Sequence, residues 1–387
     1  MSARKDRAWP AAAIAACVLS PAVLAAGETT VRIAFTPAPG SVHAKTWTIE
    51  HDVTLAELKR GVGDLLQPVN LRMQLETFQR VEVVDEYLRV GEGRPLELRR
   101  SFAKVRRYTE ERFPAAPGLA EDRPLRYREK SPLRGVSVRF TWVPERETYG
   151  KLYDGEEAEE MVLADLREDM DLRVLLPASE VVPGDTWRVA ASDLVDLVAA
   201  GGGIPFDEPE NKEDALILRS LRLGVAGSLD RIFGGVQEGG ADVTFAGLRE
   251  EAGTRLADLD VALELELAHD RTGFSRESLM KVERQEGIDF EDVHVEYHLS
   301  GTGRLVWDLD AGRAARFDFE GSETIFARVR ETRSGEDQRS TQELKLHGRF
   351  GIRVEPSDAA PLPLPGPEGL PEGTSLAAPG DDGDDEE

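Results

Sequence analysis

The mature part of this sequence lacks cysteine. Cys17 is the only cysteine among the 387 residues, and it lies in an N-terminal segment that looks like a secretory signal. If that segment is removed, neither a disulfide framework nor a thiolate metal site can form. Stability then has to come from a packed core, for which a chain of this length is sufficient.

Aromatic residues and positive charge are also scarce. Phe, Trp and Tyr make up 6% of the chain, and 73 acidic against 48 basic residues give a formal net charge of −25 at pH 7. Such a surface repels nucleic acid, so binding driven by counterion release is disfavoured. After the N-terminus no stretch approaches the ~18 apolar residues of a membrane helix. We therefore expect no nucleic-acid partner and no transmembrane segment.

The N-terminus has the features of an export signal. "MSARKDR" is short and basic, and the apolar "AWPAAAIAACVLSPAVLAA" follows it, which predicts a signal peptide over residues 1–26. Cleavage would leave a mature chain that begins near Ala26 or Gly27, in the periplasm or outside the cell. A minor alternative is lipoprotein processing at "IAAC", which would anchor the protein through Cys17.

Period-two alternation dominates the rest of the chain. Apolar residues alternate with polar ones at 31–35, 69–75, 261–267 and 293–299, which is typical of half-buried strands. The short loops that contain Gly or Asp between such runs favour antiparallel hairpins. The sequence predicts a mainly β (α+β) protein built from antiparallel meander sheets that are strongly curved or barrel-like.

Helical periodicity is confined to short stretches, which predict two or three short helices packed on the sheets. "EEAEEMVLADLRED" at 156–169 has an apolar stripe. "SDLVDLVAAG" offers Ser192 as N-cap and Gly201 as the C-terminal stop. In "TLAEL", Thr54 and Glu57 are spaced like a capping box before a short turn that ends at Gly61.

Composition divides the exported chain into three parts. "GGGIPFDEPENKED" at 201–214 interrupts every periodicity, so we place a boundary there between an N-terminal β-rich domain with short helices, 27–204, and a C-terminal antiparallel β domain, 205–355. The two β-rich parts are either a duplication or one continuous domain. Residues 356–387 are rich in proline and end in an acidic run, which predicts a disordered tail.

"DVHVEYHLS" at 292–300 contains the only candidates for a metal site. His294, Glu296 and His298 alternate along a predicted strand and point to one side. His294 and His298 are ~13 Å apart, too far to share an ion, so a site would need one of them with Glu296 and further ligands from a neighbouring strand. A solvated sheet face is the favoured interpretation. No other catalytic or cofactor-binding constellation occurs, so no cofactor is predicted.

"DMDLRVLLPASEVVPGDTWRV" at 169–189 resembles a recurring stretch of uncharacterised secreted bacterial β-rich proteins, in which a passage with leucine and proline precedes P-G-D-x-W. The resemblance implies secretion and a β-rich fold, and it transfers no catalytic residue. Pro183 and Gly184 should form a tight turn whose backbone Asp185 can bond. Trp187 should begin a strand and anchor it on the core.

These observations predict a secreted or cell-envelope protein that is not an enzyme but a non-catalytic binding or structural module of unknown ligand. The alternative is a carrier of an apolar ligand, a lipid or a lipid-modified protein, in a curved β-sheet cavity, because faces such as that of "DVALELEL" are rich in leucine. A metal-dependent hydrolase that uses His294 or His298 is the least favoured hypothesis.

Overall fold

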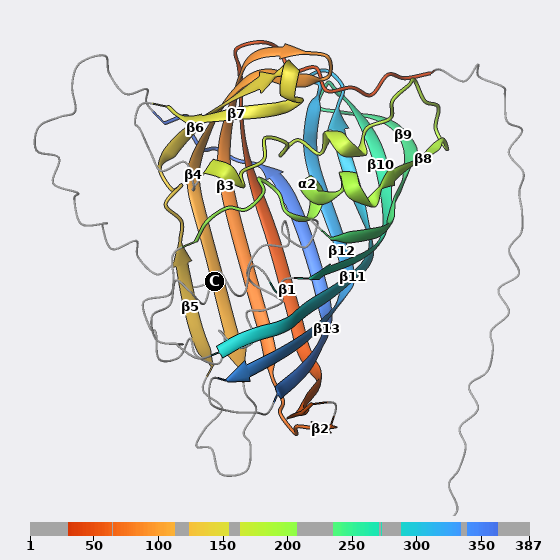
Figure 1. Cartoon of the computed structure of the whole chain (residues 1–387). Helices are drawn as coiled ribbons and strands as arrows, with labels where there is room; N and C mark the ends of the chain where they lie inside the picture. Colours follow the sequence, from red (N-terminus) through yellow and green to blue (C-terminus); the bar gives the residue numbers. More distant parts are fainter. Residues whose placement is uncertain are drawn as a thin grey trace, which may run out of the picture.

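The computed structural model describes residues 30–63, 65–112, 124–154, 163–206, 235–270, 272, 288–333 and 339–362. In these ranges the chain is mainly β, and its strands join into one antiparallel sheet of 13 strands (Figure 1). The expected mainly β class with antiparallel pairing is confirmed. The predicted signal peptide, 1–26, lies outside the described residues. No helix in the ranges above is long and apolar enough to cross a membrane.

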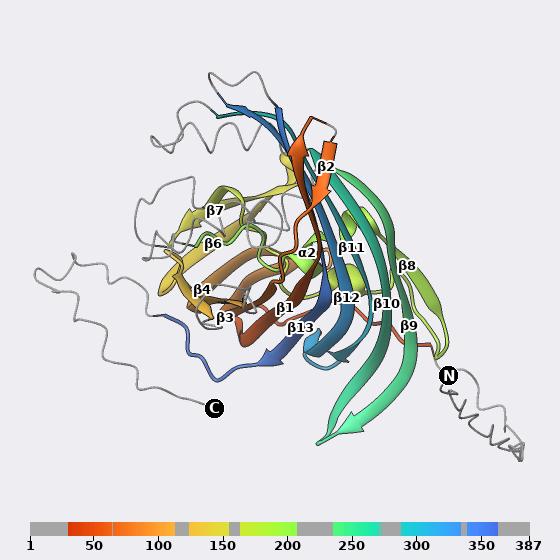
Figure 2. The ribbon, with the colours of Figure 1, turned by 90° about the horizontal axis from the view of Figure 1, so that it is seen from below.

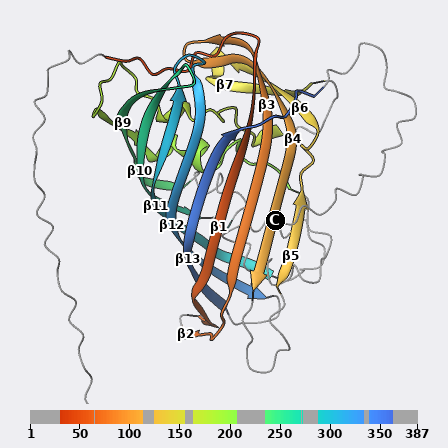
Figure 3. The same ribbon diagram turned by 180° about the vertical axis from the view of Figure 1, so that it is seen from behind.

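The strands have the following bounds: β1 Ser41–Val62, β2 Leu65–Pro68, β3 Gln74–Gly91, β4 Arg94–Arg112, β5 Leu125–Lys130, β6 Val136–Val143, β7 Thr148–Tyr153, β8 Thr186–Ala190, β9 Val236–Glu251, β10 Thr254–Asp270, β11 Ile288–Asp308, β12 Arg313–Arg333 and β13 Arg339–Pro356. Their order across the sheet is β7-β6-β4-β3-β1-β13-β12-β11-β10-β9-β8, with β2 paired to β1 and β5 to β4. Figure 3 shows the long strands side by side.

The sheet is not closed, so the expected barrel-like arrangement is wrong in this respect. The two edge strands, β7 and β8, contain six and five residues, whereas the strands from β9 to β1 across the centre contain 16 to 22. Among the described strands, β7 pairs only with β6 and β8 only with β9. Short edge strands expose few unpaired backbone groups, which is a common way for an open sheet to avoid pairing with another chain.

Strands from both predicted domains belong to this one sheet. β1 lies in the predicted N-terminal domain and β13 in the C-terminal one, and they pair from Lys45 opposite Pro356 to Val62 opposite Ser340. β8 and β9 join the same two parts at the other end of the strand order. The boundary at 201–214 stays a prediction, because residues 207–234 lie outside the described residues.

Side chains alternate between two faces of the sheet. We call the face against which residues 163–206 pack the inner face, and the opposite face the outer face (Figure 2). In β1 the buried Trp47, Ile49 and Val53 point to the inner face, while Thr48 and Glu50 between them are more exposed. The same alternation continues through the neighbouring strands, so the core lies on the inner side of the sheet.

We call residues 163–206 the crossing segment, because Figure 1 shows this part of the chain crossing the sheet near one end of the long strands. It contains the 3-10 helices η2 (Arg173–Leu175) and η3 (Ala191–Asp193), the edge strand β8 and the short helix α2 (Val195–Val198). Leu175, Leu194 and Leu197 are fully buried against the core. A further 3-10 helix, η1 (Pro144–Arg146), joins β6 to β7.

Two of the three predicted helices can be compared with the described residues in full. The stretch 192–201 is helical in η3 and α2, but Ser192 lies inside η3 and Ala190 is the N-cap, so the predicted cap is wrong. The capping box of Thr54 and Glu57 is also wrong, because both residues lie in β1. Backbone pairing with β13, through an irregularity between Leu55 and Glu57, overrides the local capping preference.

The third predicted helix, 156–169, lies partly outside the described residues, which resume at residue 163. Leu163 and Leu166 are buried there, so the apolar stripe does face the core. The strand predicted at 31–35 is reduced to one bridge between Val31 and Val181, although Ile33 and Phe35 are buried. The strand predicted at 69–75 begins only at residue 74.

The P-G-D-x-W stretch has the local structure that its residues predict. Gly184 has a positive φ of 97°, and the Val182 main-chain nitrogen donates to Asp185 Oδ2 at 2.8 Å. Trp187 lies in β8, is partly buried against the core, and donates from Nε1 to the Leu175 carbonyl at 3.1 Å.

The first residues of the predicted tail contact the outer face of the sheet. The Ser357 main-chain nitrogen donates to the Ala44 carbonyl at 3.1 Å, and Arg99 Nη2 donates to the Leu362 carbonyl at 2.9 Å. The rest of the predicted tail, 363–387, lies outside the described residues.

Candidate functional site

His294, Glu296 and His298 lie on the outer face of β11, where the alternation places them. His294 Nε2 is 3.0 Å from Glu296 Oε1, and His298 Nδ1 is 3.4 Å from Glu266 Oε1 on β10. The two histidines therefore contact different carboxylates. Over the ranges that the structure describes, no three His, Asp, Glu or Cys side chains gather to hold a metal ion.

Two groups of polar side chains are buried on the inner face. We call Lys45, Asp85, Tyr87, Arg100 and Asp171 the salt-bridge cluster. Asp85 and Arg100 lie opposite each other on β3 and β4, and both are fully buried. Arg100 donates from Nε and Nη2 to the two carboxylate oxygens of Asp85, at 2.6 and 2.9 Å. Lys45 Nζ, on β1, is 2.9 Å from Asp85 Oδ2.

The crossing segment supplies the second carboxylate of this cluster. Asp171 forms an ion pair with Lys45 and accepts a hydrogen bond of 2.7 Å from the Tyr87 hydroxyl. Two basic and two acidic side chains therefore meet without net charge. Because unpaired buried charges are very costly, this balance is what allows the cluster to be buried at all.

Main-chain carbonyls of the crossing segment are held by the same strands. Arg100 donates from Nη2 to the Glu168 carbonyl at 2.9 Å and from Nη1 to the Arg167 carbonyl at 3.3 Å. Trp47 Nε1 donates to the Met170 carbonyl at 3.2 Å. These bonds satisfy carbonyls where the segment has no regular secondary structure, so the cluster fixes the segment to the sheet.

Electrostatic shifts in the cluster agree with this structural role. Burial disfavours the charge of Asp85, but Arg100 and Lys45 outweigh it and lower the pKa of Asp85 to about 2. Burial likewise opposes the charge of Lys45, yet Asp171 and Asp85 raise its pKa above the ordinary value. Asp85 and Lys45 are therefore both charged at neutral pH.

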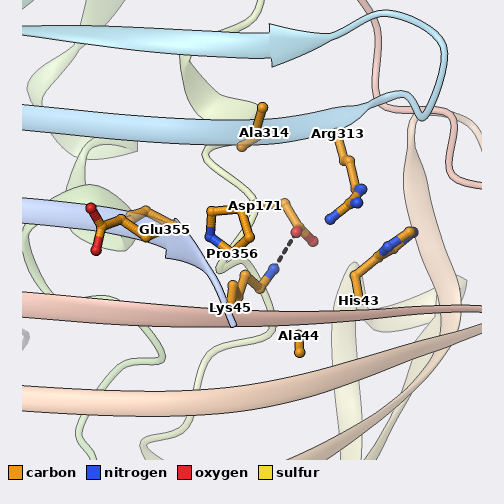
Figure 4. A pocket seen from close by; sticks show the side chains of 10 residues that line it. His43, Ala44, Lys45, Asp171, Arg313, Ala314, Glu355 and Pro356 are labelled. Atoms are coloured by element: carbon orange, nitrogen blue, oxygen red, sulfur yellow. Dashed lines mark hydrogen bonds and ion pairs between the residues drawn. The ribbon is translucent and has the colours of Figure 1, made fainter. Parts of the chain in front are cut away.

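A small pocket lies beside the cluster, lined by His43, Lys45, Asp171 and Arg313 and by the end of β13 (Figure 4). Asp171 Oδ2, His43 Nε2 and Arg313 Nε are buried there without hydrogen-bond partners. Burial, assisted by Arg313 and Lys45, lowers the pKa of His43 to about 4, so His43 is neutral at pH 7. The free volume of about 10 Å³ is near the lower limit for one water molecule, far too small for an apolar ligand.

The crossing segment also contains acidic groups that titrate near neutral pH. Burial raises the pKa of Glu168 to about 7, although its ion pair with Arg173 opposes the shift. Burial also raises the pKa of Asp196 to about 6, and Asp169 adds to the effect. Arg167 Nη1 is 3.5 Å from Asp196 Oδ1. The charge of the crossing segment is therefore expected to change near neutral pH, where the charge of Asp85 stays constant.

The second buried group we call the histidine cluster: His51, Thr77, Tyr297 and Glu323. His51 Nδ1 is 3.0 and 3.1 Å from the two carboxylate oxygens of Glu323, and the Tyr297 hydroxyl donates to Glu323 Oε2 at 2.7 Å. The side chain of Glu323 is 0% exposed and that of His51 is 8% exposed. Burial raises the pKa of Tyr297 well above its usual value, so its hydroxyl keeps its proton.

The contact between His51 and Glu323 depends on a glycine in the strand between them. His51 is on β1 and Glu323 on β12, with β13 between them, and the residue of β13 opposite Glu323 is Gly348. With no side chain at Gly348, His51 and Glu323 can meet across the strand. An added Cβ at Gly348 would lie 1.9 Å from the Asp52 carbonyl oxygen, so only glycine fits.

Thr77 completes the histidine cluster from the other side. It lies on β3 directly opposite His51 in the strand register, so the two side chains are neighbours on the inner face. Thr77 is 6% exposed, and its Oγ1 has no hydrogen-bond partner. The surroundings are apolar: Ile49 and Val53 flank His51 on β1, and the Phe350 ring centre is 5.0 Å from that of His51.

Comparison with known proteins gives no assignment: no protein-family model matches the chain, and no curated protein matches it. The resemblance of residues 169–189 to secreted bacterial β-rich proteins stays a prediction.

Sequence reasoning missed both inner-face clusters, although a signal for them exists. In each strand a polar residue occupies the inward phase of an apolar alternation: Asp85 after Val81 and Val83, and His51 between Ile49 and Val53. Such a residue must find a partner on the same face. Which strands lie next to each other, and hence which partner it finds, cannot be read from the alternation alone.

Proposed function

We propose that this protein is an exported, non-catalytic binding protein, and that its inner sheet face binds an apolar ligand. The observation that supports this most is the extent of that face. Apolar inner-face residues continue past the crossing segment toward the other end of the long strands, for example Val53, Leu75, Leu265, Ile325 and Leu346. Among the described residues, the crossing segment covers only one end of this surface (Figure 1).

The salt-bridge cluster supports a scaffold role for the covered end. Its charges are paired with one another, and its hydrogen bonds hold the crossing segment on the sheet. Charges that are paired with one another in this way fix a structure. The function is therefore expected to reside at the other end of the inner face.

Export rests on the signal-like sequence of residues 1–26. If the prediction holds, the mature chain begins only a few residues before Val31, which pairs with Val181, and before the buried Ile33 and Phe35. The mature N-terminus would then be fixed close to the core. Intact-mass measurement of protein purified from its own cells tests this: a start near residue 26 supports a cleaved signal, and a diacylated Cys17 supports the lipoprotein alternative.

A structural module is the second candidate. The inner-face apolar residues are almost fully buried, with Val53 at 0%, Leu75 at 4% and Leu346 at 1% exposure, as a filled core requires. On the outer face, charged side chains pair across strands, as Arg304 does with Asp260 at 2.7 Å. In this candidate the inner face serves only stability, and the charged outer face makes any contact with an envelope partner.

Native mass spectrometry of gently purified protein, followed by solvent extraction, separates the two candidates. A stoichiometric mass increment that extraction removes and identifies as a lipid supports the apolar-ligand proposal. A bare protein mass, together with no uptake of added amphiphile, contradicts it and favours the structural module. Elemental analysis of the same sample tests the metal-dependent hydrolase, which requires stoichiometric zinc or another transition metal.

A further inference from the structure

Three basic side chains form a row across the outer face of β3, β4 and β5. Arg80 lies directly opposite Arg106, and Arg106 lies directly opposite Lys130, on strands that Figure 3 shows side by side. The next residues along β3 and β4, Val81 and Val105, are buried in the core. The alternation therefore places the row on the outer face, where all three of its side chains are exposed.

The charges of this row repel one another. Side chains directly opposite each other on neighbouring strands have Cβ atoms about 5 Å apart, which is less than the ~8 Å screening length at physiological salt. Within the described ranges, no member of the row has an ion pair or a side-chain hydrogen bond. Elsewhere on the outer face basic side chains do pair with acids, as Arg304 does with Asp260. The row is therefore a place where the sheet lacks its usual charge compensation.

The surroundings of the row are basic as well. Lys104 and Arg128 are exposed on the same face beside it. Glu82 is the one acidic residue of this face within 78–82, 104–108 and 128–130, and Lys104 Nζ is 3.4 Å from its Oε2. With Glu82 included, these side chains carry a net charge of +4 at pH 7, in a chain whose net charge is −25. We call the five basic residues the basic patch: Arg80, Lys104, Arg106, Arg128 and Lys130.

The described part of the tail begins beside this patch. Ser357 donates a hydrogen bond to Glu82 Oε1, and Glu82 follows Arg80 by two residues on the same face. The chain then continues to Leu362, whose carbonyl accepts from Arg99 Nη2 at 2.9 Å. Arg99 precedes Arg106 by seven residues on β4, which is about 23 Å along the strand. The tail is therefore tethered to the face that carries the patch.

An acidic run follows Leu362 at a spacing that suits this distance. Residues 381–387 contain six Asp and Glu and no Lys or Arg, and they begin 19 residues after Leu362. A flexible chain of that length has a root-mean-square span of about 24 Å, and a fully extended polyproline chain spans about 59 Å. Both are sufficient to reach the patch. Because the run is tethered, its local concentration there is in the millimolar range, so weak individual ion pairs are enough for contact.

We propose that the basic patch is the docking surface for the acidic run 381–387 of the same chain. Each carboxylate that meets the patch reduces the repulsion within the row and adds an attraction between opposite charges. The contact weakens as the salt concentration increases, because both partners are exposed. While the run is docked, the patch is closed to other anions. This inference concerns the outer face and goes beyond the function proposed for the inner face.

Carbodiimide crosslinking of the mature full-length protein tests the proposal, because the reagent joins a lysine amine directly to a carboxylate that is in contact with it. Lys130 and Lys104 report on the patch. Lys345, which is exposed on β13, is the control within the same molecule. Mass spectrometry identifies the joined peptides, and a mixture of isotopically light and heavy protein separates crosslinks within one molecule from those between two.

At low salt we expect Lys130 and Lys104 to be joined to residues 381–387 about fivefold more often than Lys345. Salt at about 1 M should abolish the difference, since the screening length falls to about 3 Å. Arg80→Gln combined with Arg106→Gln should reduce the Lys130 crosslink about fivefold, because two exposed ion pairs are lost. Arg304→Gln, a matched change elsewhere on the outer face, should leave it unchanged.

Thermal unfolding provides a second measurement that does not depend on lysine chemistry. In a full-length variant whose six acidic residues at 381–387 are replaced by Asn and Gln, Arg106→Gln removes the centre of an uncompensated row. The melting temperature should therefore increase. With the acidic run intact, the same substitution should increase the melting temperature less, because the run already compensates the row. Equal shifts in the two backgrounds would overturn the proposal.

Two further outcomes would also overturn it. One is equal crosslinking of Lys130 and Lys345 to the run, or no crosslink of Lys130 at all at low salt. The other is binding to phosphatidylglycerol vesicles that Arg80→Gln with Arg106→Gln abolishes and that neutralisation of the run leaves unchanged. That result would assign the basic patch to an anionic lipid surface instead of the tail.

Discussion

The inner face carries two buried polar clusters that differ in what they hold. In the salt-bridge cluster, Lys45, Asp85, Arg100 and Asp171 balance one another in charge and hold the crossing segment. In the histidine cluster, Glu323 accepts from the Tyr297 hydroxyl and contacts His51, and no residue of the crossing segment takes part. Each cluster keeps one buried oxygen without a hydrogen-bond partner, Asp171 Oδ2 in the first and Thr77 Oγ1 in the second. Both lie on the same sheet among apolar neighbours, so the difference is not one of environment. It indicates that the first cluster fixes the crossing segment to the sheet, whereas the second connects strands of the sheet to one another.

The largest expected effect is at the centre of the salt-bridge cluster. Asp85→Ala leaves the buried Arg100 and Lys45 without their shared carboxylate, so we expect the free energy of unfolding to fall by about 3–5 kcal/mol in urea denaturation. Asp260→Ala is the matched control, because Asp260 pairs with Arg304 on the exposed outer face, where such a pair contributes less than about 1 kcal/mol. Equal losses in the two variants would contradict the structural role of the cluster.

The next effect concerns how the free energy of unfolding depends on pH. Glu168 in the crossing segment contributes to this dependence near neutral pH, and Asp85 does not. Burial raises the pKa of Glu168 from 4.5 to about 7, so the folded state favours the protonated carboxyl. Its contribution to stability is fully present below about pH 4.5 and is lost as pH rises through about 7. Glu168→Gln stays neutral throughout and should therefore gain stability relative to the wild type between pH 5 and 8, by the order of 3 kcal/mol.

Urea denaturation of wild type and Glu168→Gln at a series of pH values provides the measurement. Asp85 has its pKa lowered to about 2, so its contribution is constant in this window and would be lost only in strong acid. Parallel pH profiles for the two proteins would mean that Glu168 is not buried as described.

A smaller effect compares one tyrosine from each cluster. Tyr87→Phe removes the donor to Asp171, and Tyr297→Phe removes the donor to Glu323, so each should cost about 1–2 kcal/mol of unfolding free energy. Only Tyr87→Phe should increase cleavage within residues 163–206 by a dilute protease, because only Tyr87 holds the crossing segment. Similar cleavage of both variants would remove the distinction between the clusters.

The smallest effect is expected at the metal candidates predicted from the sequence. His294→Ala and His298→Ala change exposed or half-exposed residues of the outer face, and we expect thermal stability to stay within about 0.5 kcal/mol of the wild type. A large loss that added zinc restores would instead support a metal site at these residues.

The strands were the most predictable part of this protein. Alternation in 261–267 and 293–299 predicted β10 and β11. The short turn at Gly312, with φ of 63°, joins β11 and β12 in the antiparallel way that loops with Gly or Asp predict. The capping box of Thr54 and Glu57 failed because a motif that spans only four residues is a local signal. Pairing with β3 up to Thr54 and with β13 from Lys45 to Val62 outweighs such a signal.

The candidate site was less predictable, for a reason that its residues make clear. Glu323 follows His51 by 272 residues, and they meet only because β1, β13 and β12 are consecutive in the sheet and Gly348 leaves room between them. His294 and His298, which the sequence did single out as metal candidates, are close in sequence. The alternation along β11 that brings them to one face also places them on the outer face.

The pairing of β1 with β13 has a consequence for how the protein is made. The first long strand to leave the ribosome can pair with β3 early, but it cannot pair with β13 until residues 339–356 have been synthesised. Contacts between such distant parts of a chain form slowly, and the centre of the sheet depends on them. The edge of β1 that faces β13 therefore stays unpaired, and the centre of the sheet stays open, until synthesis of the chain is nearly complete.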